Sequence, residues 1–500
     1  MSIEWAPLPY MKQAVRFMLS HACAGLLLSP GGRKTSITLA TLKILFEKKM
    51  IRKVLIIAPR RPCYSVWPGE IEKWAQFNDL TFEILHGPKK DAALQREAQI
   101  YLINPEGLDW LLQSEKTKYQ SASMSKFAKG GEMVTRTRVD VNVAAFKKLG
   151  FDTLVIDEIH QFKNQGSQRF KMMKKIIGTF ARRYGLTGSP AANGLLDLFG
   201  QCYMLDMGNA LGQFITHFRA KYFDADHMEV SWTLKPGAEE MIYEQIAPLM
   251  LRIDTDSLQD LPEQIIVDIK LDMPTQARKV YDELEGDLIS QIDGHDVVAA
   301  NSGSASMKCR QVCQGGIYHT DAPVPGEKKG PRTWSSVHKE KVEALRGLYD
   351  ELQGSPLLIA YEFDFDVMHL REEFKAEIAM GKFVIAADVK AGDFRELERR
   401  WNAGEIAGLA GHPRAIGVGL NLQESGCNVC WYAPTWDYLF FDQLNRRVRR
   451  SGNKAVRVFI HRFIMRNTLE EYLMVPELGR KEAGQDALFS ALMRLREARR

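Results

Sequence analysis

Short apolar runs that alternate with longer helix-like stretches are the feature that most constrains the fold of this chain. In the first half such runs occur at residues 25–28, 54–58, 100–103, 154–156 and 184–186. Continuous apolar runs of this length are typical of strands buried on both faces, as in a parallel sheet covered by helices. Helical patterns, such as those at 36–48 and 71–77, lie between them. The first half therefore predicts an α/β domain.

The second half repeats this pattern, and the segment between the halves differs from both. Later apolar runs occur at 357–361, 383–386, 406–410, 429–432 and 456–463, whereas amphipathic helical patterns at 238–253 and 274–292 dominate the middle. A chain of 500 residues exceeds one ordinary hydrophobic core. We expect an α/β lobe over 1–205 with an irregular insertion at 114–140, a mostly helical region over 206–333, a second α/β lobe over 334–475, and a basic helical tail over 476–500.

The composition predicts a folded cytoplasmic protein. Apolar residues make up 45% and charged residues 26% of the chain, and the net charge of +5 does not by itself indicate nucleic-acid binding. Residues 1–5 lack a secretory signal, and no apolar run reaches the roughly 18 residues of a membrane helix. An odd number of scattered cysteines, 7, favours reduced thiols. Cys427 and Cys430 have zinc-ligand spacing, but Cys430 belongs to a strand-like run, which disfavours a metal site.

A lysine and a threonine stand where a phosphate-binding loop would place them. The sequence Leu-Ser-Pro-Gly-Gly-Arg-Lys-Thr at 28–35 follows an apolar run and opens a helix-like stretch. Backbone amides and a helix N-terminus at such a junction attract phosphate. Lys34 would contact the outer phosphates of a nucleotide, and the Thr35 hydroxyl would hold Mg²⁺.

The glycines of this loop follow the usual pattern only in part. Gly31 and Gly32 preserve flexibility, but Arg33 stands where the usual loop has glycine immediately before the lysine. The Cβ and the long side chain of Arg33 would crowd bound phosphates. An ordinary glycine-rich strand-to-helix turn is the alternative interpretation.

Two carboxylates end the apolar run at 154–156. Asp157 and Glu158 would lie at the carboxyl edge of a parallel sheet, beside the phosphate loop. Asp157 could then hold Mg²⁺, and Glu158 could orient or deprotonate an attacking water. A surface acid pair that caps the following helix is the alternative.

A basic motif lies far downstream. Gln443, Arg447 and Arg450 fall at helical spacing, so they can share one helix face. Guanidinium groups from a second domain can complete a nucleotide site by stabilising charge on the transferring phosphate. A basic helix with a solvated face is the alternative. The order of lysine, acid pair and arginine pair nevertheless favours a nucleotide-driven motor that acts on nucleic acid.

With these motifs in place, the chain resembles the Swi/Snf-like branch of the superfamily-two helicases, especially its short phage-encoded forms. The resemblance spans about residues 9–473. It is carried by Val-Leu-Ile-Ile-Ala-Pro at 54–59, Ile-Asn-Pro-Glu at 103–106, Val-Ile-Asp-Glu-Ile-His at 155–160, Leu-Thr-Gly-Ser-Pro at 186–190 with Asn193, Gly-His-Pro at 411–413, the glycine-containing stretch at 417–423 and the basic motif at 443–452.

The resemblance implies two RecA-like lobes that bind ATP and Mg²⁺ between them and DNA across both. It also implies an ATP-dependent DNA translocase or helicase. Carried over by motif, Lys34 and Thr35 bind ATP and Mg²⁺, Asp157 and Glu158 serve hydrolysis, and Arg447 and Arg450 are arginine fingers. Gly419 would lie near the nucleotide. Gln13 lies close to the position of an adenine-reading glutamine, which is Met11 here.

The resemblance also sets expectations about partners and rivals. Contact with duplex, forked or branched DNA would be mostly to phosphates and therefore independent of sequence, in the cytoplasm of a bacterium or a phage-infected host. Replication, recombination and repair are all open as pathways. Arg33, together with Ser29 where an acidic residue is usual, favours a different class: a catalytically impaired DNA-binding or scaffold protein that retains the helicase fold. A helicase directed to RNA is a third possibility.

Overall fold

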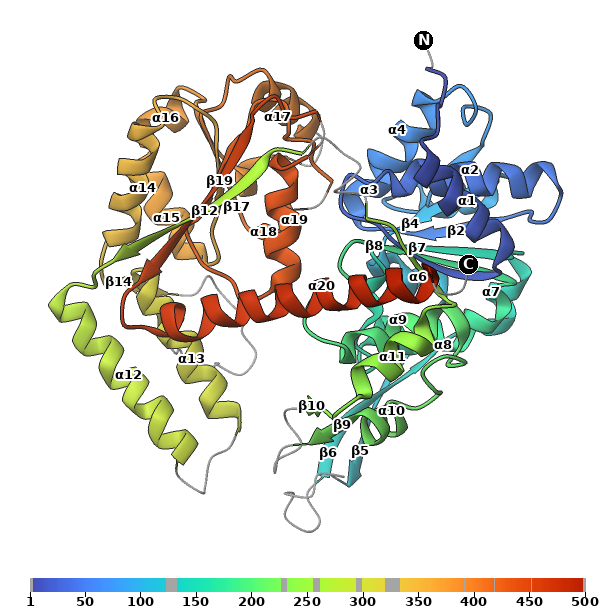
Figure 1. The fold of residues 1–500 in the computed structure, drawn as a ribbon, viewed down its shortest axis with the longest axis horizontal. Helices are drawn as coiled ribbons and strands as arrows, with labels where there is room; N and C mark the ends of the chain where they lie inside the picture. The colour runs from blue at the N-terminus through green and yellow to red at the C-terminus, as the bar shows by residue number, and fades with distance from the viewer. Residues whose placement is uncertain are drawn as a thin grey trace. The chain divides into compact units, whose positions relative to one another are not determined.

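The protein divides into two compact units. The computed structural model describes residues 3–122, 133–225, 232–254, 261–293, 299–319, 333–390, 393–417, 419–450 and 452–497. Unit 1 comprises Met1–Thr255 and Ala483–Arg500, and unit 2 comprises Asp256–Glu482. Each unit is built around one large parallel sheet, as Figure 1 shows. The predicted α/β fold with two parallel-sheet lobes is confirmed.

The sheet of unit 1 has seven strands in the order β11-β1-β8-β7-β2-β4-β3, and all described pairings are parallel. Its strands alternate between two buried cores, because Val54 and Ile56 enter one and Leu55 and Ile57 the other. The strands are β1 (Cys23–Leu27), β2 (Val54–Ile57), β3 (Phe82–Ile84), β4 (Ile100–Ile103), β7 (Thr153–Asp157), β8 (Arg182–Thr187) and β11 (Met250–Arg252).

Helices cover both faces of this sheet. One core lies under α1, α2 and α4, and the other under α6 to α11. The second core also contains Leu488 of the C-terminal helix α20 (Val475–Glu497). The helices of unit 1 are α1 (Pro9–Ser20), α2 (Lys34–Glu47), α3 (Arg60–Tyr64), α4 (Val66–Lys73), α5 (Lys90–Gln95), α6 (Leu108–Leu111), α7 (Val143–Lys148), α8 (Gln168–Ile176), α9 (Leu196–Asp206), α10 (Ile215–Tyr222) and α11 (Ala238–Ile246).

Unit 2 has a parallel sheet of six strands in the order β12-β19-β18-β15-β17-β16. Figure 1 shows α14 and α15 on one side of this sheet and α19 on the other. The strands are β12 (Glu263–Leu271), β15 (Leu357–Ala360), β16 (Phe383–Ile385), β17 (Gly408–Gly411), β18 (Asn428–Trp431) and β19 (Arg457–Met465). The helices are α12 (Thr275–Asp293), α13 (Ala299–Cys313), α14 (Glu340–Glu351), α15 (Asp364–Glu373), α16 (Lys375–Ala379), α17 (Phe394–Asn402), α18 (Pro413–Ile416) and α19 (Tyr438–Val448).

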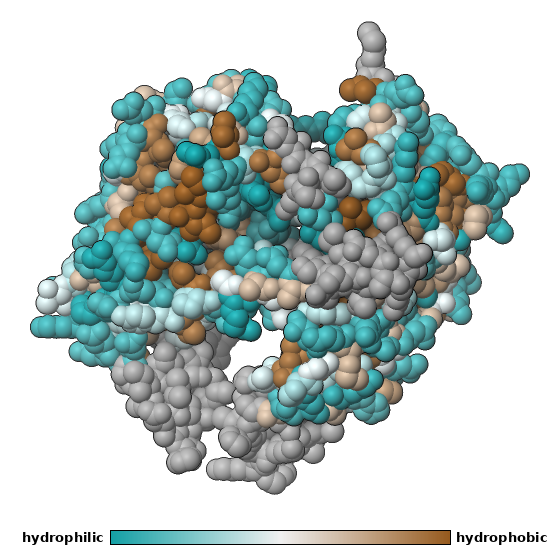
Figure 2. All heavy atoms as spheres, viewed as in Figure 1, coloured by the Kyte–Doolittle hydropathy of each residue, from teal (hydrophilic) through white to brown (hydrophobic). Residues whose placement is uncertain are grey.

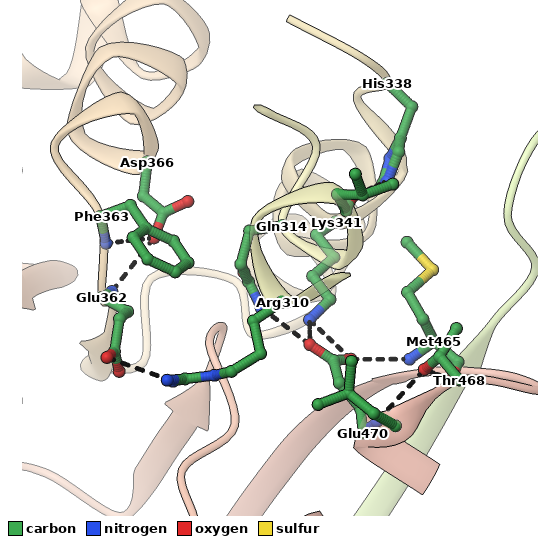
Figure 3. Close-up of polar contacts among 12 residues, drawn as sticks. Arg310, Gln314, His338, Lys341, Glu362, Phe363, Asp366, Met465, Thr468 and Glu470 are labelled. Carbon is green, nitrogen blue, oxygen red and sulfur yellow. Dashed lines mark hydrogen bonds and ion pairs between the residues drawn. The ribbon is translucent and has the colours of Figure 1, made fainter. Parts of the chain in front are cut away.

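A buried ion pair ties the helices of unit 2 to the end of its sheet (Figure 3). Lys341 of α14 lies 2.8 Å from Glu470, and their side chains are only 1% and 2% exposed. The Glu470 carboxylate also accepts hydrogen bonds from Gln314, just after α13, and from the backbone of Met465. Removing one partner would leave the other charge buried and unpaired, which would lower the free energy of unfolding by roughly 3–5 kcal/mol. The pair therefore fixes α14 and the end of α13 to the second sheet.

The expected helical region over 206–333 does not form a unit of its own. The expected helix at 238–253 is wrong beyond Ile246, because α11 ends there and β11 adds to the first sheet beside β1. β12 instead forms the edge of the second sheet, paired with β19 along its whole length. A short buried strand after a helix cannot be told from a helical turn by its apolar pattern alone. The boundary between the units therefore falls at Thr255, not at residues 206 and 333.

The insertion at 114–140 is paired where it is described. β5 (Glu115–Ala122) and β6 (Met133–Asp140) form an antiparallel pair, and residues 123–132 lie outside the described part. Lys116, Lys118 and Arg138 are exposed, so the ribbon lacks the apolar alternation that reveals a half-buried strand. The expected irregular structure is therefore wrong for these strands. The expected basic tail over 476–500 lies within α20 as far as Glu497.

The surface is mostly hydrophilic in the view of Figure 2, apart from an apolar patch on unit 2 over β12 and β19. β12 is an edge strand, and Ile266 on it is 41% exposed. None of the described helices combines the length and apolar character of a transmembrane segment.

Candidate nucleotide site

The loop between β1 and α2 has the geometry of a phosphate-binding turn. β1 ends at Leu27 and α2 begins at Lys34, so the helix N-terminus opens directly from the loop. Gly31 adopts a left-handed backbone with φ 89°, which glycine tolerates without strain. The Lys34 ammonium donates to the Leu28 carbonyl at 2.9 Å and so lies back over the loop. The first amides of α2 have no acceptor within the helix and can bind phosphate oxygens.

Arg33 occupies the place of the usual glycine in a left-handed conformation, with φ 56° and ψ 34°. For a residue with a Cβ this conformation costs about 1–2 kcal/mol. The Arg33 side chain is exposed, whereas Gly32 beside it is buried. The departure from glycine is therefore accommodated by strained backbone, with the long side chain directed to the surface.

The acid pair lies at the same edge of the sheet. Asp157 is the last residue of β7, and β1, β8 and β7 are parallel neighbours, so their carboxyl ends meet beside the phosphate loop. Burial and then the adjacent Glu158 carboxylate raise the pKa of Asp157 above its ordinary value, while the Lys34 ammonium opposes this shift. The Lys34 charge thus acts on the Asp157 carboxylate, and the roles expected of Lys34 and the acid pair stay predictions.

Glu158 is held by a short chain of polar contacts that leads back to the phosphate loop. It has a left-handed backbone, with φ 57° and ψ 56°, and begins the 3₁₀ turn η2 (Ile159–Phe162). His160 Nδ1 lies 3.1 Å from Glu158 Oε2 and 3.3 Å from Thr187 Oγ1. A Cβ at Gly188 would lie 2.9 Å from the Pro30 ring, so the segment after β8 packs directly on the loop.

These residues fit a magnesium nucleotide. Half-buried Thr35 and Asp157 offer hydroxyl and carboxylate oxygens, which Mg²⁺ prefers, next to Lys34 and the helix amides. Among the described residues, no group of three or more His, Cys, Asp or Glu could hold a metal ion by itself. One hydroxyl and one carboxylate suit Mg²⁺, because this ion usually takes one or two protein carboxylates and completes its shell with phosphate and water.

Gln13 lies on α1, one turn after Tyr10. The Arg33 charge acts on the Tyr10 hydroxyl, whose pKa is raised chiefly by burial, so this part of α1 lies close to the phosphate loop. Gln13 is half-buried on α1. Its expected contact with the base stays a prediction.

In unit 2, two arginines converge on one loop. Arg447 of α19 donates to the carbonyls of Gly417 and Leu420, both at 2.9 Å. Arg450 donates to Asn421 Oδ1 at 3.0 Å. The same loop carries Gly419, which has a left-handed φ of 73°. The guanidinium groups expected to act as arginine fingers are thus brought together with the glycine expected near the nucleotide.

The expectation that Gln443, Arg447 and Arg450 share one helix face is wrong for Arg450. α19 ends at Val448, because Asn453 Nδ2 donates to the Val448 carbonyl at 2.7 Å and turns the chain. Gln443 and Arg447 do lie on α19, and Gln443 is 6% exposed. Arg450 reaches the arginine-bound loop from the irregular segment after the helix.

Trp67 is a site residue that the sequence did not reveal. Its side chain is completely buried in the first core of unit 1. However, its indole N–H donates to Asp157 Oδ2 at 3.1 Å across 90 residues of sequence. No spacing or motif links the two positions.

A family model described as an SNF2-related domain matches residues 10–317, more than half of the chain. The chain belongs to the SNF2-related domain family. The resemblance stated from the motifs is thereby confirmed at the level of the family. The SNF2-related match includes the phosphate loop, the acid pair and Trp67, while Arg447 and Arg450 lie beyond its end.

Relatives of this SNF2-related chain include a phage protein of nearly equal length. Putative protein p41 of Acyrthosiphon pisum secondary endosymbiont phage 1 is 27% identical over 98% of this chain and 99% of its own length. The uncharacterized ATP-dependent helicase MG018 of Mycoplasma genitalium is 27% identical over 67% of this chain, which spans only 30% of that protein. The SWI2/SNF2 ATPase core of Sulfolobus solfataricus, solved in complex with dsDNA, gives a TM-score of 0.42 at 18% identity, over 98% of this chain and 94% of that one. The family and the curated helicase relative support a SWI/SNF-type ATPase.

Proposed function

We propose that this protein is an ATP-dependent DNA translocase that couples ATP hydrolysis to movement on DNA or to its remodelling. One observation carries the proposal: the loop with Lys34 and the acid pair follow strands of the first parallel sheet at the same edge, and the Lys34 charge acts on Asp157. Gly31, Gly32 and Lys34 would hold the phosphates. The Thr35 hydroxyl and the Asp157 carboxylate would hold Mg²⁺, which neutralises charge on the phosphates when it is bound.

Within this proposal, Glu158 orients the attacking water and accepts its proton. The contacts to His160 hold the carboxylate at the start of η2, beside the phosphate loop. Gln13 would contact the base. Gln443, Arg447, Arg450 and Gly419 of unit 2 would act on the nucleotide from the second lobe, the two arginines by stabilising negative charge on the transferring phosphate.

DNA is the proposed partner because of the family and the relatives. One curated relative is the CHD3-type chromatin-remodeling factor PICKLE of Arabidopsis thaliana. The protein would contact mostly the phosphates of DNA, so its affinity for DNA would fall steeply as the salt concentration rises. The turnover experiment below compares duplex, forked and branched DNA. Replication, recombination and repair all stay open as pathways.

The test is ATP turnover measured with duplex DNA, forks, branched junctions, single strands and RNA. The proposal expects stimulation by DNA, and Glu158→Gln is expected to reduce turnover at least about 100-fold because the general base is lost. The exposed Glu72→Gln, on α4, is the matched control and should leave turnover unchanged. Full activity of Glu158→Gln would contradict the assigned role, and stimulation by RNA alone would replace DNA as the partner.

A second candidate is a DNA-binding or scaffold protein that retains the fold without turnover. The left-handed Arg33 in the phosphate loop is the observation that favours it. This candidate predicts that the protein does not bind Mg-ATP, whereas the proposed translocase must bind it. A measurement of equilibrium nucleotide binding therefore distinguishes the two.

A further inference from the structure

Trp67 makes one specific polar contact, and it is to a residue of the candidate site. The Trp67 side chain is 0% exposed, and its indole N–H donates to Asp157 Oδ2 at 3.1 Å. An indole nitrogen can only donate, so a buried tryptophan needs an acceptor. Here the acceptor is the carboxylate expected to hold Mg²⁺, not a backbone carbonyl.

The position of this donor is set by rigid structure. Trp67 lies on α4 and packs in the same core as Ile71 of that helix and Cys63 of α3. Cys63 Sγ in turn donates to the Ala58 carbonyl, directly after β2, at 3.3 Å. β2 is the parallel neighbour of β7, the strand that carries Asp157. The donor therefore lies on a helix packed next to β2, and the carboxylate ends the adjacent strand β7, so the two cannot easily separate.

A fixed donor restricts how the carboxylate can turn. The terminal torsion of an aspartate is broad and has no strong intrinsic preference. A hydrogen bond to Oδ2 selects one range of this torsion and so determines where both oxygens point. Metal ligands are commonly oriented in this way by donors behind them, and loss of such a donor typically weakens metal binding 10- to 100-fold.

From this geometry we infer that Trp67 is a positioning residue that orients the Asp157 carboxylate for Mg²⁺. The inference rests on the proposed function, because it concerns the same nucleotide site. It assigns to a buried aromatic side chain a role in metal affinity, in addition to its packing.

The test replaces Trp67 by phenylalanine, which keeps an aromatic ring and removes the donor. The measurement is the Mg²⁺ concentration that gives half-maximal binding of a fluorescent ATP analogue to the full chain. Trp67→Phe is expected to raise this concentration roughly tenfold. Binding of the analogue in EDTA is expected to stay as in the wild type, since a purely structural defect would weaken both.

A double-mutant cycle shows whether the effect passes through Asp157. In the Asp157→Asn background, Trp67→Phe should change the Mg²⁺ concentration for half-maximal binding by less than about twofold, because the oriented carboxylate is already gone. An effect as large as in the wild type would overturn the inference.

The chain offers a matched control. Trp74, at the end of α4, is also buried, and its indole N–H donates to the Glu70 carboxylate at 2.7 Å. Neither residue belongs to the candidate site. Trp74→Phe should therefore show the wild-type response to Mg²⁺.

Each remaining outcome is decisive. If folded Trp67→Phe needs the same Mg²⁺ concentration as the wild type for half-maximal binding, the inference about Trp67 is wrong but the proposed function is not affected. The same holds if Trp67→Phe loses binding equally with and without Mg²⁺. A wild-type protein that binds no Mg-ATP overturns the proposed function and this inference together. If Trp67→Phe does not fold, benzothienylalanine at position 67 replaces the N–H by sulfur in nearly the same shape, and the same criteria then apply to that protein.

Discussion

At the scale of single residues, the candidate site is marked by backbone strain. Arg33 and Glu158 both have left-handed conformations although neither is glycine. Such conformations cost of order 1–3 kcal/mol each and persist only where the surrounding structure enforces them. Arg33 directly precedes Lys34 and Glu158 belongs to the acid pair, so the strain coincides with the proposed chemistry.

Replacing Arg33 by glycine should release part of this strain. We expect the free energy of unfolding of Arg33→Gly to rise by up to about 1 kcal/mol, because the left-handed cost disappears while the unfolded chain gains some freedom. Urea unfolding measures this change, and nucleotide binding shows whether Arg33 limits affinity for Mg-ATP.

Lys49 provides the control for that substitution. It is exposed, has φ 56° and lies after the end of α2, away from the loop. Lys49→Gly should gain similar stability with no change in nucleotide affinity. A loss of stability in Arg33→Gly would show that the arginine side chain makes contacts that outweigh the strain.

At the scale of elements, a buried histidine just before α14 packs against the end of α13. His338 is 7% exposed and its Nε2 lies 2.8 Å from the Val312 carbonyl at the end of α13. Burial lowers the pKa of His338 to about 4. The ring is therefore neutral in the folded protein at pH values where the unfolded chain already binds a proton.

This histidine should make unit 2 sensitive to acid. Between pH 6.5 and 4 the unfolded state binds a proton that the folded state does not, so the free energy of unfolding falls as the pH falls, by at most about 3 kcal/mol. His338→Gln keeps a side-chain donor and should reduce this loss. Urea unfolding at several pH values measures it.

The exposed His319 is the matched control, because His319→Gln should leave the pH dependence of unfolding unchanged. Identical pH profiles for the wild type and His338→Gln would contradict the assignment of the acid sensitivity to His338.

At the scale of the whole molecule, the proposed reaction needs residues from both units. The phosphate loop and the acid pair belong to unit 1, whereas Arg447 and Arg450 belong to unit 2. Nucleotide binding should therefore depend mainly on unit 1, whereas turnover should depend on both units.

Substitution of Arg447 should separate these two steps. Arg447→Ala is expected to lower kcat about 100- to 1000-fold, since a cation at the transition state is lost, while the Kd for Mg-ATP changes little. Arg446→Lys is the control on the same helix, because Arg446 pairs with Asp442 and a lysine keeps the charge of that pair. A parallel loss of binding in Arg447→Ala would place its role in ground-state affinity.

Features that depend on local signals in the sequence were predictable, whereas features that depend on contacts between distant residues were not. Most strands of both sheets and the phosphate loop were predictable, because continuous apolar runs and a glycine-rich turn before Lys34 are local signals. The place of Asp157 at the end of β7 was predictable for the same reason. β11 was missed because its strand character depends on pairing with β1, more than 200 residues earlier.

The sequence by itself determined that two α/β lobes form, because local hydrophobic patterns specify the strands and helices of each lobe. It also determined that a lysine follows one strand and that two acids lie at the carboxyl end of another, because parallel strands place these ends at one edge of the sheet. Only the tertiary structure decided that Trp67 supports Asp157, that Asn453 ends α19 before Arg450, and that Arg33 is held left-handed. These features depend on single side-chain contacts or on the backbone angle of one residue, and neither leaves a periodic trace in the chain.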